Sequence, residues 1–353
     1  MPTLTSYTKS TEESILNTPP SADGEMAFST DTKKLFISEG TEWVYWTADR
    51  TTGKYYLGSD QVPRPFHHFD PTVSTSMADT NGLAVSNGGS IATIKDLAGG
   101  AKLEAETALQ QPTLVSAPGT TPFALPSGDA RINGLPVWRF DGNHYLEPSI
   151  EMKRQVAYST GVTIMVVHRQ IPQYKTPDNS ALSTYYIPST DARYSPYTAL
   201  LGLWNDIAIT PRTDTNASKY WYNRFIANLN STYLNRYDGD QGECSLSVFR
   251  CSVNPFSAKL DFEQKHVTSL GTQSTLGSAS VVGSNNSNVY RISSSSTRSF
   301  QLGGLRLGTN VSHGSYKYRG EVGEILVWGE SLNQGDCDKA GEYLASKWGF
   351  TWS

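Results

Sequence analysis

The chain has 353 residues, of which 37% are hydrophobic, 11% aromatic and 18% charged, and its formal net charge is −4. A chain of this length can bury a sizeable core, and sandwich domains of roughly 200–250 residues are ordinary. The charge excludes a basic footprint for nucleic acid and a polybasic tail for a membrane surface. No secretory leader and no run of about 18 apolar residues is visible, so we expect neither nucleic-acid binding nor membrane insertion.

The N-terminal part differs in character from the rest. Residues 1–22 are rich in Thr, Ser and Pro, and Pro19-Pro20 opposes regular structure, which predicts an extended docking arm. Residues 23–65 predict a small β-meander and a linker, with short strands separated by polar turns. The third strand carries Trp43, Tyr45 and Trp46, which so small a meander can hardly bury alone. We expect these three aromatic residues to make assembly contacts.

The next long segment combines one clear strand with an aromatic, polar region. Residues 161–169 are β-branched and almost continuously apolar, which predicts a buried strand. Residues 170–230 are rich in Tyr, Asn, Asp and Pro, a composition typical of loops. Their aromatic residues suit a protein interface, with glycan stacking and plain packing as the alternatives. The candidates are Tyr185, Tyr186, Tyr194, Tyr197, Tyr220, Trp221 and Tyr222.

The C-terminal stretch predicts one strand that leads directly into one capped helix. Residues 324–328, Glu-Ile-Leu-Val-Trp, are branched or aromatic and lie between glycines, as in a sandwich-core strand. Asn333 can cap the following helix, and Asp336 suits its positive start. Apolar residues recur at helical spacing as far as Trp348, and Gly349 suits the terminator.

This pattern resembles the end of concanavalin A-like (laminin-G/pentraxin-type) jelly-roll domains, which are common in phage and bacterial surface proteins. Further motifs of such domains occur upstream in the same order: Phe69-Asp-Pro71, Asp96-Leu-Ala-Gly-Gly100, Gln111-Pro112, Asn133-Gly-Leu-Pro-Val-Trp-Arg-Phe-Asp-Gly142 and Phe300-Gln-Leu-Gly-Gly304. The resemblance implies an all-β fold, with a jelly-roll β-sandwich and a short C-terminal helix over residues 66–353. The preceding meander is similar to a unit that recurs in tailed-phage fibres and other virion proteins.

Cysteine usage favours a reduced protein. The chain has three cysteines. Cys244 and Cys251 lie seven apart, so a single strand would send them to opposite faces and forbid a disulfide along it. Cys337 falls on the apolar side of the predicted helix, as a small buried hydrophobe would.

No catalytic constellation is visible in the sequence. Glycan hydrolysis on this fold uses two carboxylates at even spacing on one strand. Glu321 and Glu324 differ by three positions and are expected on opposite faces, whereas Asp261 and Glu263 share a face as an isolated pair. Neither a Gly-x-Ser-x-Gly elbow nor a His-Glu-x-x-His motif occurs. We therefore expect a protein without enzymatic activity.

Two places invite a metal ion. His67-His68 with Asp70 is the densest cluster of histidine and carboxylate. Adjacent strand residues face opposite ways, so at most one histidine joins Asp70, and packing at a strand edge is the expected role. The loop from Asp238 to Glu243 offers calcium the oxygens of Asp238, Asp240 and Glu243, with an ordinary turn as the alternative. No other cofactor is expected.

The union of meander and jelly roll predicts a structural protein on the virion surface of a tailed bacteriophage, as a capsid decoration or a head or tail fibre component. It would be made in the host cytoplasm, bind other virion proteins through residues 1–60 and form a homotrimer. Its lectin-like jelly roll would face outward and contact host glycans. The alternative is a bacterial carbohydrate-binding or glycan-processing module.

Overall fold

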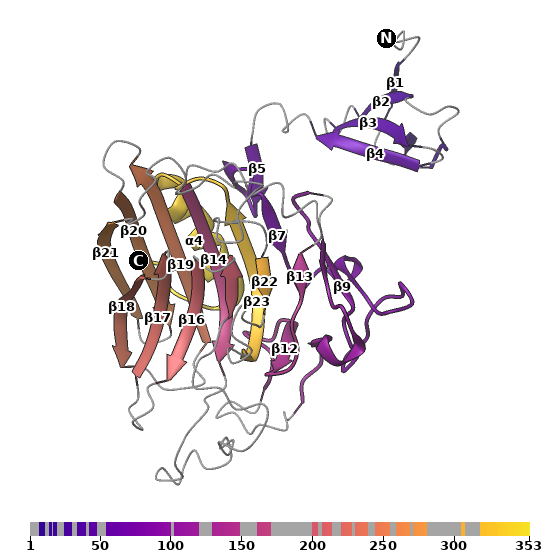
Figure 1. Cartoon of the computed structure of the whole chain (residues 1–353). Helices are drawn as coiled ribbons and strands as arrows, with labels where there is room; N and C mark the ends of the chain where they lie inside the picture. The colour runs from indigo at the N-terminus through magenta and orange to yellow at the C-terminus, as the bar shows by residue number, and fades with distance from the viewer. Residues whose placement is uncertain are drawn as a thin grey trace, which may run out of the picture. The chain divides into compact units, whose positions relative to one another are not determined.

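The computed structural model of the chain describes the following residues: 7–10, 14–15, 17–19, 25–29, 34–39, 42–47, 54–99, 102–119, 129–148, 161–170, 200–203, 207–213, 220–227, 230–238, 244–254, 259–268, 271–280, 305–307 and 318–353. Its contacts divide the chain into two compact units, Met1–Arg64 and Pro65–Ser353. Each unit has β-sheets of its own (Figure 1).

The N-terminal unit contains the expected meander. Its four-stranded sheet has the order β1-β2-β3-β4, and β2, β3 and β4 are antiparallel neighbours. Strand β1 pairs with β2 in parallel and falls within the segment expected to be an extended arm. A two-stranded hairpin, β5-β6, completes the unit. The bounds are β1 (Tyr7–Ser10), β2 (Met26–Ser29), β3 (Lys34–Glu39), β4 (Glu42–Thr47), β5 (Lys54–Leu57) and β6 (Asp60–Pro63).

The C-terminal unit is built on an eight-stranded antiparallel sheet. Its order is β11-β12-β23-β14-β19-β20-β21, with β7 also paired to β23 (Figure 1). Every residue of β23 is buried, as a run of branched and aromatic residues predicts. The bounds are β7 (His67–Phe69), β11 (Thr113–Val115), β12 (Val137–Asp141), β14 (Gly161–Gln170), β19 (Cys244–Asn254), β20 (Lys259–Thr268), β21 (Gly271–Ser280) and β23 (Arg319–Trp328).

Two smaller sheets lie beside it. A four-stranded sheet has the order β13-β10-β9-β8, and a five-stranded sheet has the order β18-β17-β16-β15-β22. The five-stranded sheet contacts β21 through β18, and β13 through β22. The bounds are β8 (Met77–Ala78), β9 (Thr93–Lys95), β10 (Lys102–Glu104), β13 (Glu147–Pro148), β15 (Leu201–Leu203), β16 (Ile207–Thr213), β17 (Tyr220–Ala227), β18 (Asn230–Asp238) and β22 (Leu305–Leu307), with short 3-10 helices at η1 (Ser74–Ser76) and η2 (Ala108–Gln110).

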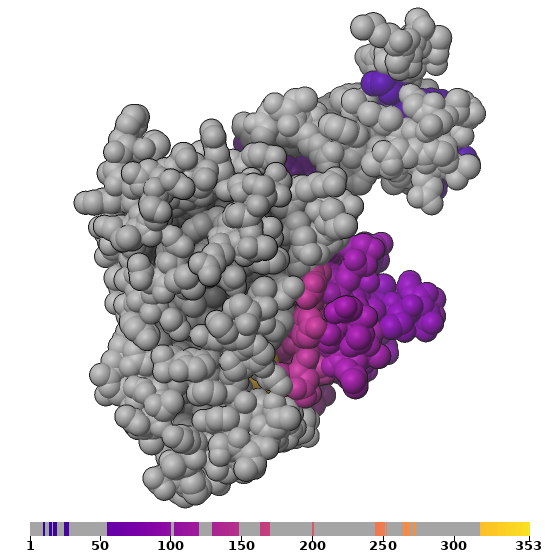
Figure 2. All heavy atoms as spheres, viewed as in Figure 1, coloured from indigo at the N-terminus to yellow at the C-terminus, as the bar shows by residue number. Residues whose placement is uncertain are grey.

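The architecture confirms the predicted fold class: an all-β jelly-roll sandwich with a short C-terminal helix, preceded by a small meander. In Figure 2 the residues around the four-stranded sheet, coloured purple to magenta, form one contiguous patch on the visible surface. The loop prediction for residues 170–230 is wrong in part, because β15, β16 and β17 lie there. Tyr, Trp and Ile favour strands whatever the share of Asn and Asp around them.

The helix α4 (Gln334–Trp348) has the predicted ends. The Asn333 side chain accepts a hydrogen bond from the Asp336 backbone N–H, and Gly349 is left-handed at φ 81°. Trp348 is buried, and its ring would lie 3.0 Å from a Cβ placed on Gly323 of β23. A glycine at position 323 therefore lets the helix approach the large sheet. Among the described residues, no helix has the length and apolar character needed to cross a membrane.

Candidate functional site

A β-bulge in β23 places two carboxylates on one face of the large sheet. Val167 of β14 faces two residues of β23, Gly323 and Glu324, where regular pairing would give it one. The extra residue turns Glu324 to the face that α4 covers. Glu321 belongs to that face too, since it alternates with Gly323 along the strand. The expectation that Glu321 and Glu324 point to opposite faces is therefore wrong. It assumed regular alternation along β23, and the bulge interrupts that alternation.

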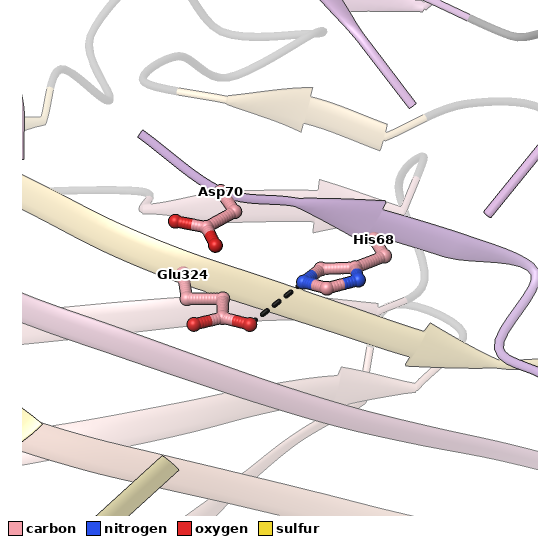
Figure 3. A group of neighbouring side chains, drawn as sticks. All are labelled: His68, Asp70 and Glu324. Atoms are coloured by element: carbon pink, nitrogen blue, oxygen red, sulfur yellow. Dashed lines mark hydrogen bonds and ion pairs between the residues drawn. The ribbon is translucent and has the colours of Figure 1, made fainter. Parts of the chain in front are cut away.

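Glu324 of β23 is the centre of a buried polar cluster to which the β7 segment and α4 contribute. Figure 3 shows His68, Asp70 and Glu324 of this cluster. One carboxylate oxygen, Oε1, lies 2.7 Å from His68 Nε2 and accepts a hydrogen bond from the Tyr343 hydroxyl at 2.9 Å. The other oxygen, Oε2, accepts from Lys347 Nζ at 2.7 Å and from Trp348 Nε1 at 3.1 Å. Three elements distant in sequence are thus held by one carboxylate.

Asp70 completes this cluster from the end of β7. Its Oδ2 accepts a hydrogen bond from Lys347 Nζ at 2.5 Å, and its Oδ1 accepts from the Thr72 backbone and hydroxyl. His67 belongs to the opposite side of β7, where its Nδ1 lies 2.9 Å from Asp96 Oδ2. The prediction that only one of the two histidines joins Asp70 is confirmed, and that histidine is His68.

His68, Asp70 and Glu324 place their ligand atoms within 4.8 Å of one another. One imidazole and two carboxylates are a donor set that metal ions accept. The ammonium group of Lys347, however, is bonded to both carboxylates. A metal ion would have to displace it, so the geometry favours an ion-pair cluster with Lys347 as its cation.

The charges of this cluster support one another. Burial opposes the charge of Glu324, but its hydrogen bond to His68 and the charge of Lys347 bring its pKa below the usual range. Burial likewise opposes the charge of Lys347, yet Glu324 and Asp70 hold its pKa above the usual range. Both groups are therefore ionised at neutral pH, and each depends on the other.

A second buried cluster lies further along the same face. The Glu321 carboxylate accepts hydrogen bonds from Arg139 at 2.9 Å and from Arg169 at 3.2 Å. Arg169 also donates to the backbone oxygens of Asp129 and Ala130. These bonds tie β12, β14 and β23 together and anchor the chain before β12.

A third cluster lies on the other face of the large sheet. The Ser247 hydroxyl lies 2.9 Å from His168 Nε2 and 3.0 Å from His266 Nδ1. Burial and the neighbouring His266 lower the pKa of His168 to about 3, and burial lowers the pKa of His266 to about 4. Both imidazoles are therefore neutral at neutral pH. All three groups are buried, so they serve the interior of the unit.

A different kind of surface emerges from the register of the five-stranded sheet. Arg212 of β16, Tyr222 of β17 and Arg236 of β18 lie directly opposite one another in a row. Residues in register share a face, and the face alternates along each strand. The polar face so defined carries Gly202, Ala208, Thr210, Arg212, Tyr220, Tyr222, Arg224, Ile226, Ser231, Tyr233, Arg236, Asp238 and Arg306.

The opposite, apolar face has a contrasting composition. It carries Leu201, Leu203, Ile207, Ile209, Pro211, Thr213, Trp221, Asn223, Phe225, Ala227, Asn230, Thr232, Leu234, Tyr237, Leu305 and Leu307. A β-sandwich buries the apolar face of each sheet and leaves the polar face to solvent. The residue types that the register places on the polar face make it the candidate binding surface.

The predicted site residues are distributed as follows. Tyr220 and Tyr222 belong to the polar face, and Trp221 belongs to the apolar face. Tyr185, Tyr186, Tyr194 and Tyr197 lie outside the described residues, as do the expected calcium ligands Asp240 and Glu243. Asp238 ends β18. On β4, the positions of Trp43 and Tyr45 belong to one face of the strand, and the position of Trp46 belongs to the other.

The sequence alone did not identify the four arginines of the polar face as candidate site residues. They are spread over four strands, and no spacing motif connects them. The alternation of polar and apolar residues over 207–213 and 220–227 is the signal that would have found them, once these segments are assigned to strands.

No protein-family model and no curated protein matches the chain. Similar solved structures include a GH54 α-L-arabinofuranosidase, at 8% identity over 83% of this chain and 64% of that one, with a TM-score of 0.45. A SAP-like pentraxin from Limulus polyphemus is 10% identical over 52% and 70% of the two chains, with a TM-score of 0.31. A sialidase from Trypanosoma rangeli is 11% identical over 92% and 44%, with a TM-score of 0.38. The chain thus spans about 64% of the length of the arabinofuranosidase.

These comparisons change one expectation and leave another without support. The expectation of a protein without enzymatic activity is corrected, because glycoside hydrolases are among the similar structures, and missing sequence motifs therefore do not exclude catalysis. The expectation of a virion protein gains no support from the similar structures named above. Likeness at these TM-scores assigns neither an activity nor a ligand to this chain.

Proposed function

We propose that this protein is a carbohydrate-recognition module that contacts a glycan through the polar face of its five-stranded sheet. The observation that carries the proposal is the row Arg212, Tyr222 and Arg236, in which the strand register places an aromatic residue between two arginines. Sugars present apolar ring faces and hydroxyl edges, so they bind where aromatic rings and polar groups alternate.

The neighbouring positions continue this pattern. Tyr220 is in register with Asp238, and Arg224 is in register with Tyr233. The register therefore places aromatic, basic, acidic and hydroxyl-bearing residues on three adjacent strands of the polar face. A sheet face with this mixture suits an extended chain of sugars better than a single small molecule, which would need a closed pocket.

The buried clusters are poor alternatives for glycan contact. Glu324, Glu321 and Ser247 are each bonded to neighbouring side chains and are buried. A sugar could reach them only if α4 or a sheet moved away. We therefore assign these clusters to the stability of the fold.

Binding of the full-length protein to a glycan array, followed by calorimetry on the hits, tests the proposal. Tyr222→Ala should weaken binding by roughly 3- to 10-fold, the range for losing one aromatic contact. Tyr56→Ala is the matched control, because Tyr56 is an exposed tyrosine of the β5-β6 hairpin. Mass spectrometry of the incubated glycans will show whether recognition is accompanied by cleavage. Binding that Tyr222→Ala leaves unchanged would contradict the proposed surface.

A further inference from the structure

We propose that Asn133 is a site of spontaneous deamidation, and that this modification weakens the docking of α4 on the large sheet. The proposal is independent of glycan recognition. Three features carry it: the turn that precedes β12, the glycine that follows the asparagine, and the contact between this turn and the C-terminal end of α4.

Asn133 and Gly134 are the two central residues of a tight turn. The Leu135 N–H donates a hydrogen bond to the Ile132 oxygen at 2.9 Å, and these two residues form an antiparallel bridge. Asn133 has φ 50° and Gly134 has φ 73°, so both are left-handed. This is a type I′ turn, for which Asn-Gly is a preferred sequence. Asn133 is also exposed to water.

An asparagine followed by a glycine can undergo a covalent rearrangement. The Gly134 backbone nitrogen attacks Cγ of Asn133 and forms a new C–N bond. The side-chain nitrogen leaves as ammonia and takes with it the proton of the Gly134 N–H. Water then opens the cyclic succinimide at either of its carbonyl groups and gives aspartate or isoaspartate. Glycine favours the attack because it has no side chain that would crowd its nitrogen.

The sequence contains three Asn-Gly pairs, and the other two are more constrained. Attack requires the glycine nitrogen to lose its proton. Gly82 and Gly88 each donate their N–H to a backbone oxygen, at 3.1 and 2.8 Å. In a type I′ turn the closing hydrogen bond comes from the residue after the glycine, here Leu135, and does not involve the Gly134 N–H. We therefore expect Asn133 to react first.

The amide group of Asn133 also holds the end of α4. Its Nδ2 donates a hydrogen bond to the Lys347 oxygen at 3.1 Å. Lys347 lies in the last turn of the helix, where carbonyl oxygens lack partners within the helix and form the negative end of its dipole. The Asn133 side chain lies against Gly349 as well, where a Cβ would come within 2.9 Å of the Asn133 Cγ. One side chain thus joins the turn before β12 to the C-terminus of α4.

Deamidation would turn this attraction into a repulsion. A carboxylate has no N–H to donate, and it places a negative charge beside the Lys347 oxygen at the negative end of the helix. Isoaspartate also adds one atom to the backbone within a turn of fixed length. The same end of α4 carries Trp348, which is buried and bonded to Glu324. Loss of the Asn133 contact therefore weakens the packing of the helix, and the protein becomes less stable as it ages.

Ageing of the full-length protein at mildly alkaline pH tests the proposal, because base removes the proton from the attacking nitrogen. Peptide mass spectrometry follows the three Asn-Gly pairs, and a protein isoaspartyl methyltransferase detects the isoaspartate. We expect position 133 to convert before positions 81 and 87. Conversion of either of those positions while Asn133 stays intact would overturn the assignment of the site.

Two aspartate variants measure the consequence for stability. Asn133→Asp places the product directly in the turn, which tolerates Asp-Gly. It should lower the urea midpoint by about 0.5 M, the effect of one lost hydrogen bond at an ordinary denaturant slope. Asn87→Asp is the matched control. Asn87 is exposed and precedes a glycine, but its Oδ1 accepts hydrogen bonds from the Ser116 and Ala117 N–H groups. An aspartate keeps this acceptor, so the midpoint should not fall.

A third variant connects ageing to this one residue. Asn133→Gly fits the turn and cannot deamidate, so its urea midpoint should stay constant under conditions in which that of the natural protein declines. Should Asn133→Asp fail to fold, the aged natural protein, separated by charge, supplies the aspartate form for the same measurement. An aspartate form as stable as the unmodified protein, or an equal decline of Asn133→Gly on ageing, would overturn the proposed effect on α4.

Discussion

Lys347 is the residue on which the buried cluster depends most. Its ammonium group is bonded to Asp70 and to Glu324, and its side chain is 20% exposed while that of Glu324 is 0% exposed. Removing the cation would leave two carboxylates close together with little water to screen them. A buried ion pair that loses one partner is destabilised far more than a surface pair.

We expect Lys347→Met to lower the free energy of unfolding by about 3 kcal/mol, the lower end of the range for breaking a buried pair. Urea denaturation at pH 7 measures it. Lys339→Met is the matched control on the same helix, where Lys339 pairs with Asp336 at the surface, and should change stability by less than about 1 kcal/mol. Equal effects of the two variants would contradict the ion-pair cluster.

The same variant separates an ion pair from a metal site. With Lys347 removed, His68, Asp70 and Glu324 would offer an imidazole and two carboxylates without a competing ammonium. Zinc or calcium should therefore raise the melting temperature of Lys347→Met and leave that of the natural protein unchanged. Stabilisation of the natural protein by a metal ion would show that the ion displaces Lys347.

His168 and His266 should make the fold sensitive to mild acid. Their pKa values are lowered to about 3 and about 4 in the folded protein, whereas the unfolded chain binds protons near pH 6.5. The unfolded state therefore takes up protons first as the pH falls. Stability is fully present above pH 6.5 and is lost below it, by about 1.4 kcal/mol per pH unit for each imidazole.

Urea midpoints measured from pH 7 to pH 5.5 test this dependence, above the range in which ordinary carboxylates titrate. His168→Gln keeps a hydrogen-bonding amide near Ser247 but does not titrate, so its stability should fall less steeply with acid. His144→Gln, at a half-buried histidine after β12, serves as the control. Parallel curves for the natural protein and His168→Gln would refute the role of this imidazole.

At the scale of elements, β23 and α4 form the part of the fold that the sequence predicts best. The run from Glu324 to Trp328 predicts the strand, and the spacing up to Trp348 predicts the buried face of the helix. Both are local patterns of hydrophobicity and capping, which tertiary contacts reinforce here. The bulge at Gly323 and Glu324 cannot be predicted from the local sequence, because it depends on how β23 pairs with Val167 of β14.

We expect Trp348→Ala to destabilise the jelly-roll unit by about 3–5 kcal/mol, the range for deleting a large buried aromatic side chain. Trp348 is 1% exposed and also donates a hydrogen bond to Glu324. Thermal and urea denaturation measure the loss. Ser346→Ala, at an exposed position of the same helix, controls for helix propensity. A melting temperature within a degree of the natural protein would show that α4 is not packed as described.

The strands of the five-stranded sheet show where sequence reasoning fails. Residues 220–238 contain Asn, Asp and Tyr at high density, which composition alone assigns to loops. The alternation that defines β17 and β18 appears only when odd and even positions are compared with a partner strand. Tyr220 and Tyr222 can be proposed as candidates from composition alone, whereas the arginines opposite Tyr222 depend on pairing between separate strands.

At the scale of the whole molecule, the chain consists of two units with separate sheets. The N-terminal sheet ends in β4, whose Trp43, Tyr45 and Trp46 occupy an edge strand within the described residues. Aromatic edge strands favour pairing with another chain. We keep as a proposal that residues 1–60 join three copies of the protein.

Sedimentation tests this assembly directly. The full-length protein should sediment as a homotrimer, and a chain that begins at Pro65 should sediment as a folded monomer with an unchanged melting transition. A full-length protein that remains a monomer near 38.7 kDa at micromolar concentration would contradict the proposal. Loss of the melting transition in the shortened chain would show instead that the two units depend on each other for stability.

The central claim is that the five-stranded sheet turns its arginine- and tyrosine-bearing face to solvent, and cysteine labelling tests it most directly. Arg224 and Phe225 are consecutive residues of β17 and belong to opposite faces. Arg224→Cys and Phe225→Cys are treated with a thiol reagent in the native state, and labelling is read by peptide so that the three natural cysteines are distinguished. We predict rapid labelling at position 224 and strong protection at position 225. Equal labelling, or protection at 224 with exposure at 225, would contradict the assignment of the polar face and the proposed function built on it.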